Sequence, residues 1–499
     1  MKKGVIAALI VYVLLLSSMP SLFLLLFPLG GILLLYVLTR IYGGCGSLQE
    51  TAEIWFISHA LGGITYIFHA YGFSFFPLFF VILAIITGKV LLDKIQKVHC
   101  LTKGVALSSL ILYAVFVYIF TVAEMTTSLF YAGLLGIIFL NRHKLSREAF
   151  VLLYRSTWGI SLMETLAHRY PRMLRFFGWG SIILGFGGMI FITGYVFYNV
   201  FQLLFVAHAV PSISPLLPGV QLPGSPIALP LFYGIISLFF VVVIHEFFHG
   251  VLARTYAIPV KSSGLVLFGP LLGAFVEPDE TILRKRTAPI QLSIFSVGPC
   301  SNIVAAALVL LVLLFALIPL REMFFSFTPL EIQAVRDQGP AAKAGITSES
   351  LVFSIDGRNV TTIDDFTAFM TNATPEKALE IVTNKGMFRV YPEKAENRVV
   401  LGVTLQKSLL LKETGLGFLP WTLIYLEQLL SWFIIISIGI GIANLLPIGP
   451  VDGGRMLHVG LAQIFTKKES EWIWQWVGTS LFLAIIFILL FPFFTWVLP

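Results

Sequence analysis

Long apolar stretches separated by short polar links make up most of this 499-residue chain. A helix of about 20 apolar residues is long enough to cross the hydrocarbon core of a bilayer. On this criterion the pattern predicts about 11 spans. They lie near residues 4–19, 22–41, 54–71, 75–92, 104–122, 127–141, 176–205, 230–256, 290–320, 418–447 and 473–498. The first could be a cleaved signal peptide, but a retained span is the favoured interpretation.

Two segments between the predicted spans follow other patterns. Residues 142–175 carry seven Arg or Lys and two Glu among apolar residues. This composition predicts an amphipathic, basic connector, an interfacial helix on the cytoplasmic leaflet. Residues 261–280 are apolar but interrupted too often by glycine to span a membrane. They predict a β-hairpin that dips into the membrane, or a plain buried hairpin.

The pattern changes between residues 321 and 415, which are charged, rich in β-forming residues and punctuated by turns. This range predicts one soluble α/β domain inserted between two spans. The predicted fold class is therefore a polytopic α-helical membrane protein with an inserted α/β domain. Its predicted parts are an accessory N-terminal transmembrane bundle (1–141), the connector (142–175), a first core part (176–320), the soluble domain (321–415) and a second core part (416–499).

The composition is that of a membrane protein. Only 12% of the residues are charged, about half the share of about 25% in soluble proteins, and the mean hydropathy is +0.91. The net charge of +7 is spread over short loops, so it indicates topology and gives little support for nucleic-acid binding. With the basic loops inside, the N-terminus is cytoplasmic and the range 321–415 lies outside.

The helix predicted near residues 230–256 carries the sequence HEFFH. His245 and His249 are four residues apart, and Glu246 directly follows the first. Residues i and i+4 share one face of a helix, so both imidazoles can bind one metal ion. Glu246 then lies beside the ion, where it can take a proton from a bound water. An acidic side chain in a span costs roughly 2.5–3.5 kcal/mol, so a metal site explains this pattern better than a structural polar cluster.

A catalytic zinc ion needs a third protein ligand and an open position for water. The three cysteines are far apart and form no C-x-x-C pair, which predicts neither a cysteine metal site nor a disulfide scaffold. The remaining candidates are Asp452, Glu277 and Glu280. Glu277 follows the predicted hairpin and precedes a proline, a poor place from which to return to the helix face. Asp452 lies where Pro447 and Pro450 break a span, and a carboxylate at that depth needs a cation, so we favour Asp452.

Three short motifs carry a resemblance to a known family. HEFFH, GPCSN (298–302) and NLLPIGPVDGG (444–454) resemble, in this order, the signatures of the site-2 protease family of intramembrane metalloproteases. The resemblance covers roughly residues 176–499, and the six leading spans lie outside the shared core. It implies that Asn302, in the second motif, supports the core.

The same resemblance implies a role for each candidate residue of the site. His245, His249 and Asp452 would bind Zn²⁺, and Glu246 would activate the attacking water. Asn444 would help to position the substrate or its oxyanion.

A second resemblance concerns the soluble domain. Residues 332–366 resemble a PDZ domain of the bacterial, circularly permuted type, which makes the inserted domain PDZ-like. Glu349 and Ser350 replace the usual Gly-Asp pair, and no clear glycine-containing carboxylate-binding loop precedes Ile332. The resemblance implies a peptide-binding module, or a size filter that admits only substrates with trimmed ectodomains.

The resemblance to the site-2 protease family implies peptide hydrolysis within transmembrane segments of membrane-protein substrates, as in regulated intramembrane proteolysis. A substrate helix must unwind locally, and the hairpin 261–280 and Asn444 are the candidates to hold its exposed backbone. The predicted partners are transmembrane substrates and the lipid bilayer. The predicted location is the cell membrane, with a multi-pass chain, an active site toward the cytoplasmic side and the PDZ-like domain outside. The alternatives are a membrane zincin that uses Glu277 or Glu280, and a zinc transporter lined by polar groups within spans.

Overall fold

The computed structural model describes most of the chain. The described residues are 23–41, 44–48, 50–52, 54, 92–93, 95–99, 102–148, 151–206, 209–221, 225, 227–268, 270–336, 338–360, 362–395, 398–411 and 418–497. They form two compact units, one made of Met1–Val309 with Leu429–Pro499 and the other of Leu310–Gln428.

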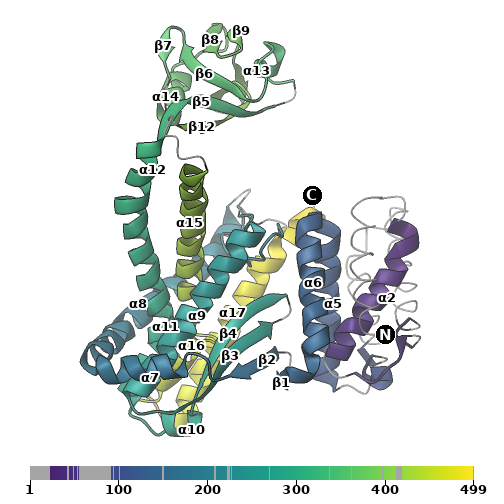
Figure 1. Ribbon diagram of the computed structural model, residues 1–499, viewed down its shortest axis with the longest axis vertical. Coiled ribbons are helices and arrows are strands. Elements are labelled where there is room, and N and C mark those ends of the chain that lie inside the picture. Colours follow the sequence, from purple (N-terminus) through teal and green to yellow (C-terminus); the bar gives the residue numbers. More distant parts are fainter. Residues whose placement is uncertain are drawn as a thin grey trace. The chain divides into compact units, whose positions relative to one another are not determined.

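Among the described residues, five helices are long and apolar enough to cross a membrane. These helices span Pro171–Phe205, Leu231–Thr255, Ala288–Phe324, Pro420–Ala443 and Lys467–Phe491. They correspond to the five spans that the sequence predicts after residue 175. In Figure 1 these spans lie in α8 (Pro171–Phe205), α9 (Leu231–Thr255), α11 (Ala288–Val312) with α12 (Ile318–Phe324), α15 (Leu419–Ala443) and α17 (Lys467–Val497). The short segment η3 (Leu313–Leu317) joins α11 to α12.

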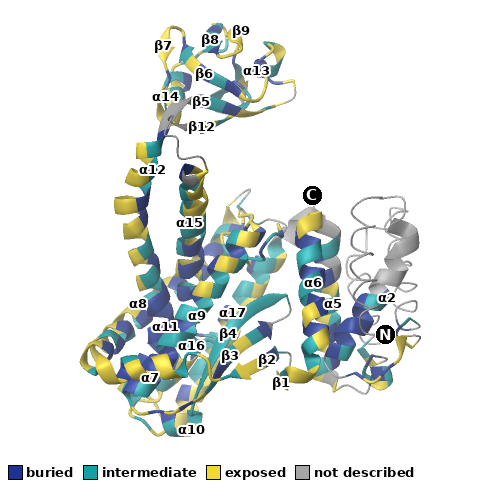
Figure 2. Ribbon diagram, in the orientation of Figure 1, coloured by how far each residue is buried: buried dark blue, intermediate teal, exposed yellow. Residues whose placement is uncertain are grey.

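Large apolar side chains are exposed along these helices. On α8, for example, Phe176, Ile183, Ile190 and Phe191 are each more than half exposed (Figure 2). An exposed apolar surface of this extent is unfavourable in water and favourable against lipid tails. The burial pattern therefore agrees with helices that lie in a bilayer.

The six leading spans are described only in part. The predictions at 4–19, 54–71 and 75–92 fall almost entirely outside the described residues. The predictions at 22–41, 104–122 and 127–141 coincide with α2 (Phe23–Ile41), α5 (Lys103–Val122) and α6 (Met125–Asn141). Leu38, Phe116 and Tyr131 of these three helices pack in one apolar core. Cys45, between the first two of them, is disulfide-bonded, a single bond that the spacing of the cysteines did not indicate.

The segment 261–280, for which the sequence predicts a hairpin, forms two antiparallel strands. They are β3 (Val260–Phe268) and β4 (Leu271–Pro278), paired so that Leu265 lies opposite Ala274. β4 packs against α9. The hairpin is followed by the short helix α10 (Glu280–Leu283).

The connector 142–175 differs from the predicted interfacial helix. Its first part forms a turn, η2 (Arg142–Lys144), and two strands, β1 (Ser146–Glu148) and β2 (Val151–Ser156). β2 pairs with β3, so the sheet has the order β1-β2-β3-β4. Among the described residues of the connector, the α-helical ones are α7 (Ile160–Arg169) and the first turn of α8. The apolar run of β2 satisfies the backbone groups at the edge of β3, and this long-range pairing overrides the local helical pattern.

A break separates α15 from the next helix of the core. α15 ends at Ala443, and α16 (Asp452–Leu461) begins after an eight-residue turn that contains Pro447 and Pro450. Leu445 and Met456, on either side of this turn, are completely buried with Leu252 and Ile294 of α9 and α11. The turn is therefore fixed by the same apolar core that holds the helices.

The second unit contains the range 321–415 that the sequence predicts as a soluble domain. Its sheet has the strand order β12-β5-β6-β8-β9, with β7 (Arg358–Asn359) paired to β6. The strands are β5 (Phe325–Val335), β6 (Ser350–Ile355), β8 (Leu379–Thr383), β9 (Gly386–Val390) and β12 (Val403–Leu411), accompanied by α13 (Pro340–Lys343), α14 (Ile363–Thr371) and the two-stranded ribbon β10 (Glu393–Ala395) and β11 (Arg398–Val400). Leu330, Val352 and Ile381 lie in its core.

Asp356 fixes the tight turn between β6 and β7. Its backbone is in the left-handed region, with φ at 45°, a conformation that Asp tolerates better than most residues. Its Oδ1 accepts the backbone N–H of Glu380 at 2.8 Å, and its Oδ2 lies 3.3 Å from Nζ of Lys377. The N–H of Glu380 lowers the pKa of the Asp356 carboxyl, and the charge of Lys377 adds to this effect. The ionised form therefore stabilises the turn.

Replacing Asp356 by Asn keeps the tolerance for a positive φ but removes the charge. A hydrogen bond to a charged group is stronger than a neutral one by about 1 kcal/mol. We expect the Glu380 amide to exchange with deuterium about fivefold faster in Asp356→Asn at pH 7. Because the folded pKa is lowered, the advantage of the native chain should be present above the ordinary carboxyl pKa and shrink as the pH falls through the lowered value.

Hydrogen exchange followed by mass spectrometry of the full-length protein checks this prediction. Asp364→Asn, an equal change of charge at the exposed start of α14, is the matched control. Equal exchange rates at Glu380 in the two variants would contradict the assigned role of Asp356.

Candidate metal centre

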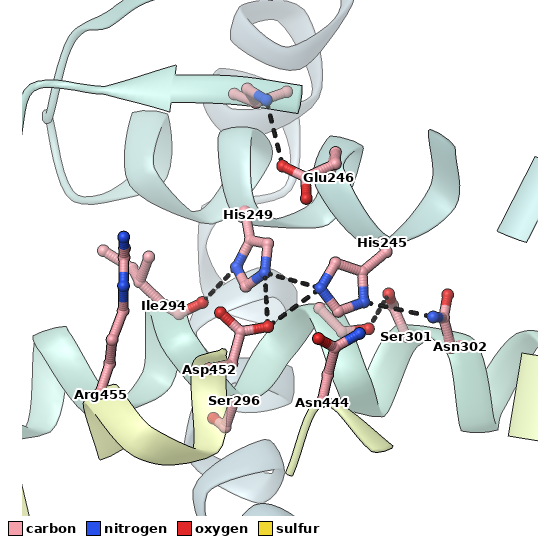
Figure 3. Close-up of polar contacts among 12 residues, drawn as sticks. His245, Glu246, His249, Ile294, Ser296, Ser301, Asn302, Asn444, Asp452 and Arg455 are labelled. Atoms are coloured by element: carbon pink, nitrogen blue, oxygen red, sulfur yellow. Dashed lines mark hydrogen bonds and ion pairs between the residues drawn. The ribbon is translucent and has the colours of Figure 1, made fainter. Parts of the chain in front are cut away.

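α9 presents two imidazoles on one face. His245 and His249 are both buried, their ring centroids lie 4.8 Å apart, and the two Nε2 atoms lie 3.2 Å apart (Figure 3). The spacing of four residues on an α-helix produces this convergence, as the sequence predicts. Both nitrogens point toward the same small volume.

Asp452 completes the group from the opposite side. It is the first residue of α16, and its Oδ2 lies 3.0 Å from Nε2 of His245 and 3.2 Å from Nε2 of His249. The three ligand atoms all lie within 4.8 Å of one another. Residues more than 200 positions apart in the chain thus meet at one point.

The donor set and its spacing fit a zinc ion. Two nitrogens and one carboxylate oxygen are a ligand set of catalytic zinc sites. Ligand atoms about 2.0–2.1 Å from an ion, at the tetrahedral angle, lie about 3.3 Å from each other. The observed separations of 3.0–3.2 Å are close to this value. The residues present therefore fit Zn²⁺, with one tetrahedral position left for water.

α11 holds both imidazoles in the orientation that this site needs. A histidine that binds a metal through Nε2 carries its proton on Nδ1, and this N–H needs an acceptor. Nδ1 of His249 lies 2.6 Å from the backbone oxygen of Ile294, to which it donates. Nδ1 of His245 lies 3.2 Å from the side-chain amide of Asn302, as shown in Figure 3.

The amide of Asn302 has two possible orientations at this contact. With Nδ2 toward His245, its Oδ1 is buried without a hydrogen-bond partner among the described residues. Turning the amide by 180° places Oδ1 of Asn302 against Nδ1–H of His245. The oxygen then accepts a hydrogen bond from the imidazole N–H. The family resemblance implies that Asn302 supports the core, and here its side chain contacts a candidate metal ligand.

Gly298 leaves space for the two imidazoles, a role that we did not predict from the sequence. A Cβ atom at this position would lie 2.3 Å from Nε2 of His249 and 2.8 Å from Nε2 of His245. Both distances are far below van der Waals contact, and they involve the two nitrogens that are the candidate metal ligands. The first letter of the motif GPCSN is the signal that could have identified it.

Glycine has a similar role at the start of α16. A Cβ at Gly453 would lie 2.2 Å from the backbone oxygen of Leu445, and a Cβ at Gly454 would lie 2.1 Å from that of Ile448. The two glycines let the first turn of α16 press against the preceding turn. This close approach fixes Asp452, directly before them.

Glu246 and Asn444 lie beside the three ligand residues. Glu246 is next to His245 on α9, and its Oε2 accepts the backbone N–H of Val276 of β4 at 3.1 Å. Asn444 lies just after α15, with Nδ2 donating to the backbone oxygen of Ile440 at 3.1 Å. Its own backbone oxygen accepts the N–H of Gly453 at 2.7 Å. In Figure 3, Asn444 lies near His245, on the side of the ring where Asp452 is found.

The two alternative third ligands are engaged elsewhere. Glu277 accepts a hydrogen bond from Ser262 at 2.6 Å and lies 3.5 Å from Nε of Arg155. Glu280 lies 3.1 Å from Nη1 of Arg455. Among the described residues, neither belongs to the group formed by the two histidines and Asp452.

Gly298→Ala is expected to disrupt the centre without removing any ligand. The added Cβ must push both imidazoles away from Asp452. Changes to groups that orient metal ligands lower metal affinity by about 10–100-fold, so we expect the purified protein to retain less than about a tenth of its zinc. Elemental analysis by mass spectrometry measures the zinc-to-protein ratio. Gly439→Ala on α15, where an added Cβ meets nothing within 4 Å, is the matched control and should keep its zinc. Full zinc in Gly298→Ala would show that the ion binds elsewhere.

The sequence of this chain is similar to those of several known proteins. It is 28% identical over 250 residues to an uncharacterized protein of Methanocaldococcus jannaschii, a match that covers 49% of this chain and 61% of the relative. It is 24% identical over 259 residues to the zinc metalloprotease RasP of Oceanobacillus iheyensis, covering 41% and 59%. A putative zinc metalloprotease of Streptococcus pyogenes is 26% identical over 237 residues, covering 36% and 55%. The matches thus span less than two thirds of the length of each relative.

The family assignment rests on a longer match. The sequence profile of peptidase family M50 matches residues 233–489, just over half of the chain and the range that holds every residue of the centre. The family match confirms the prediction of a zinc cofactor, because peptidase family M50 is zinc-dependent. The five long apolar helices agree with a multi-pass membrane protein. This chain belongs to peptidase family M50, the site-2 protease family.

Proposed function

We propose that this chain is an intramembrane zinc metalloprotease that hydrolyses peptide bonds within transmembrane segments of membrane-protein substrates. One observation carries the proposal. The ligand atoms of His245, His249 and Asp452 converge on one point. Both histidines and Glu246 lie on α9, a helix that is long and apolar enough to span a bilayer. A carboxylate next to such a group has the position of a general base.

Each residue of the centre has a different role in the proposed reaction. His245, His249 and Asp452 would hold Zn²⁺, which when bound supplies a Lewis acid that makes water more acidic and polarises the scissile carbonyl. The carboxylate of Glu246 takes the proton of the attacking water. The protonated Glu246 then gives this proton to the nitrogen of the leaving amine. Asn444, close to the ligands, is the group that would hold the substrate backbone or its oxyanion.

The free edge of the sheet supports a docking mode for the unwound substrate. β4 is the last strand in the order β1-β2-β3-β4 of the described sheet. Its Val276 N–H points away from β3 to Glu246. An extended peptide that adds a strand beside β4 would make backbone hydrogen bonds along this edge. Its scissile bond would then lie beside Glu246.

A polar pocket supports a supply of water to the site. The pocket has a volume of about 560 Å³ and is lined in part by Phe295, Gly454 and Arg455. Phe295 follows Ile294, which holds His249, and the other two belong to the helix that begins with Asp452. We place this pocket on the cytoplasmic side of the membrane, where the basic loops lie.

We further propose that the range 321–415 of the second unit is a PDZ-like domain outside the membrane. Its strand β5 is paired on both edges, with β12 and with β6, so β5 has no free edge for a peptide. A size filter for substrates is therefore a better interpretation of this unit than peptide capture at β5.

Replacing Glu246 by Gln tests the proposed chemistry. Gln still accepts the N–H of Val276 but cannot take a proton, so we expect the rate of cleavage to fall by about 10²–10⁴-fold while the zinc content stays unchanged. The assay incubates the purified protein with a single-span reporter substrate in liposomes, with and without a zinc chelator. Glu277→Gln, the same change outside the ligand group, is the matched control and should cleave like the native protein.

A zinc transporter makes the opposite prediction. It does not need a base at position 246, so zinc transport in Glu246→Gln with no cleavage by the native protein would overturn the protease assignment. Loss of zinc in Glu277→Gln would support the alternative zincin.

A further inference from the structure

A second pocket lies between α9 and one face of the four-stranded sheet. It has a volume of about 340 Å³ and contains Glu246 in its wall. Its remaining lining comes mainly from β2, β3, β4 and α9, with Trp158, Gly159 and Met163 beside them. None of the metal ligands lines it.

The sheet side of the pocket follows from strand register. Tyr154 lies opposite Leu265, and Leu265 lies opposite Ala274, so these three residues share one face of the sheet. Ser156 and Ser263 lie opposite each other, two residues along on the same face. All five line the pocket.

The helix side of the pocket follows from helical spacing. Phe239, Val243 and Phe247 are spaced by four residues and therefore form one stripe along α9. The metal ligands His245 and His249 form another stripe on the same helix. Glu246 lines the pocket and is adjacent to His245 in sequence, so it joins the pocket to the metal centre.

The lining requires an apolar guest. The hydroxyl of Ser263 donates to the backbone oxygen of Trp158 at 2.5 Å, and the hydroxyl of Ser156 donates to the backbone oxygen of Ser263 at 3.2 Å. The carboxylate of Glu246 accepts the N–H of Val276. These polar groups are paired within the walls, so a polar guest would lose its bonds to water without replacement.

The position of the pocket indicates where the guest comes from. Successive side chains of a strand point to opposite faces of its sheet. A substrate strand beside β4 would therefore direct alternate side chains to the face of Ala274, which is the pocket face. Because Glu246 is both the candidate base and part of the wall, the side chain that enters belongs to a residue adjoining the scissile bond.

We propose that this pocket is a specificity site that binds a bulky apolar side chain of the substrate next to the cleaved bond. The proposal rests on the proposed protease function and on substrate docking at β4. It assigns Val243, in the middle of the helical stripe, as a residue that sets the size of the accepted side chain. A lipid acyl chain is the competing occupant, and the experiment separates the two.

The test compares Val243→Phe and Val243→Ala with the native protein in liposomes. The substrates are single-span reporters with Ala, Val, Leu or Phe at each residue flanking the cleaved bond, which mass spectrometry of the products locates. Val243→Phe narrows the pocket, so kcat/KM for one flanking Leu or Phe should fall by about tenfold or more relative to Ala. Val243→Ala should shift the preference toward Phe.

Ile236→Phe is the matched control. Ile236 lies on the same helix, is 41% exposed and does not line the pocket, so this variant should keep the native preference. The zinc content of each variant shows that its centre is intact.

Each outcome decides the proposal. If Val243→Phe lowers the cleavage of all substrates equally, the pocket does not bind a substrate side chain. It then has a structural role or holds a lipid. Unchanged cleavage by a zinc-loaded Val243→Phe would also overturn the pocket. Absence of chelator-sensitive cleavage by the native protein is a different result, because it would overturn the protease function and the pocket together.

Discussion

The structure depends on a carboxylate, that of Asp452, which lies among apolar helices with only 15% of its side chain exposed. Asp452 has its Oδ2 at 3.0–3.2 Å from two imidazole nitrogens, with Leu445 and Met456 completely buried close to it in the chain. An unpaired charge in such surroundings costs several kcal/mol, whereas a divalent cation shared with two histidines offsets this cost. The helices α9 and α11 and the turn before α16 pack so closely that Gly298, Gly453 and Gly454 have no room for a Cβ atom. Sharing one ion among the two histidines and Asp452 would require such close packing. The same packing places Glu246, the candidate base, next to the candidate ligands.

Much of this centre could be predicted from the sequence because its signals are either local or energetically unusual. His245, Glu246 and His249 follow from the geometry of a single helix turn. Asp452 is far away in the chain, but a carboxylate beside two helix-breaking prolines at membrane depth is rare enough to identify it. The five long apolar helices follow from length and hydropathy alone. The family resemblance added Asn302 and Asn444, whose amides give no such signal.

The remaining features depend on contacts that no local pattern encodes. The sequence of residues 151–156 predicts part of an amphipathic helix, but Tyr154 pairs with Leu265, more than 100 residues away, and these residues form the strand β2. The bond from Val276 to Glu246 uses a backbone N–H, which every residue except proline carries. The pocket beside Glu246 is assembled from two strands and a helix whose side chains are ordinary core residues when taken singly. A pattern can show that a residue is apolar, but only the fold shows which space it lines.

The central proposal is one ion shared by His245, His249 and Asp452, and anomalous X-ray diffraction at the zinc absorption edge tests it directly. Crystals of the full-length protein should show an anomalous peak at about 2.0–2.2 Å from the two Nε2 atoms and from Oδ2 of Asp452. A zinc peak on Glu277 or Glu280, or an ion bound to the histidines with Asp452 out of reach, would contradict it.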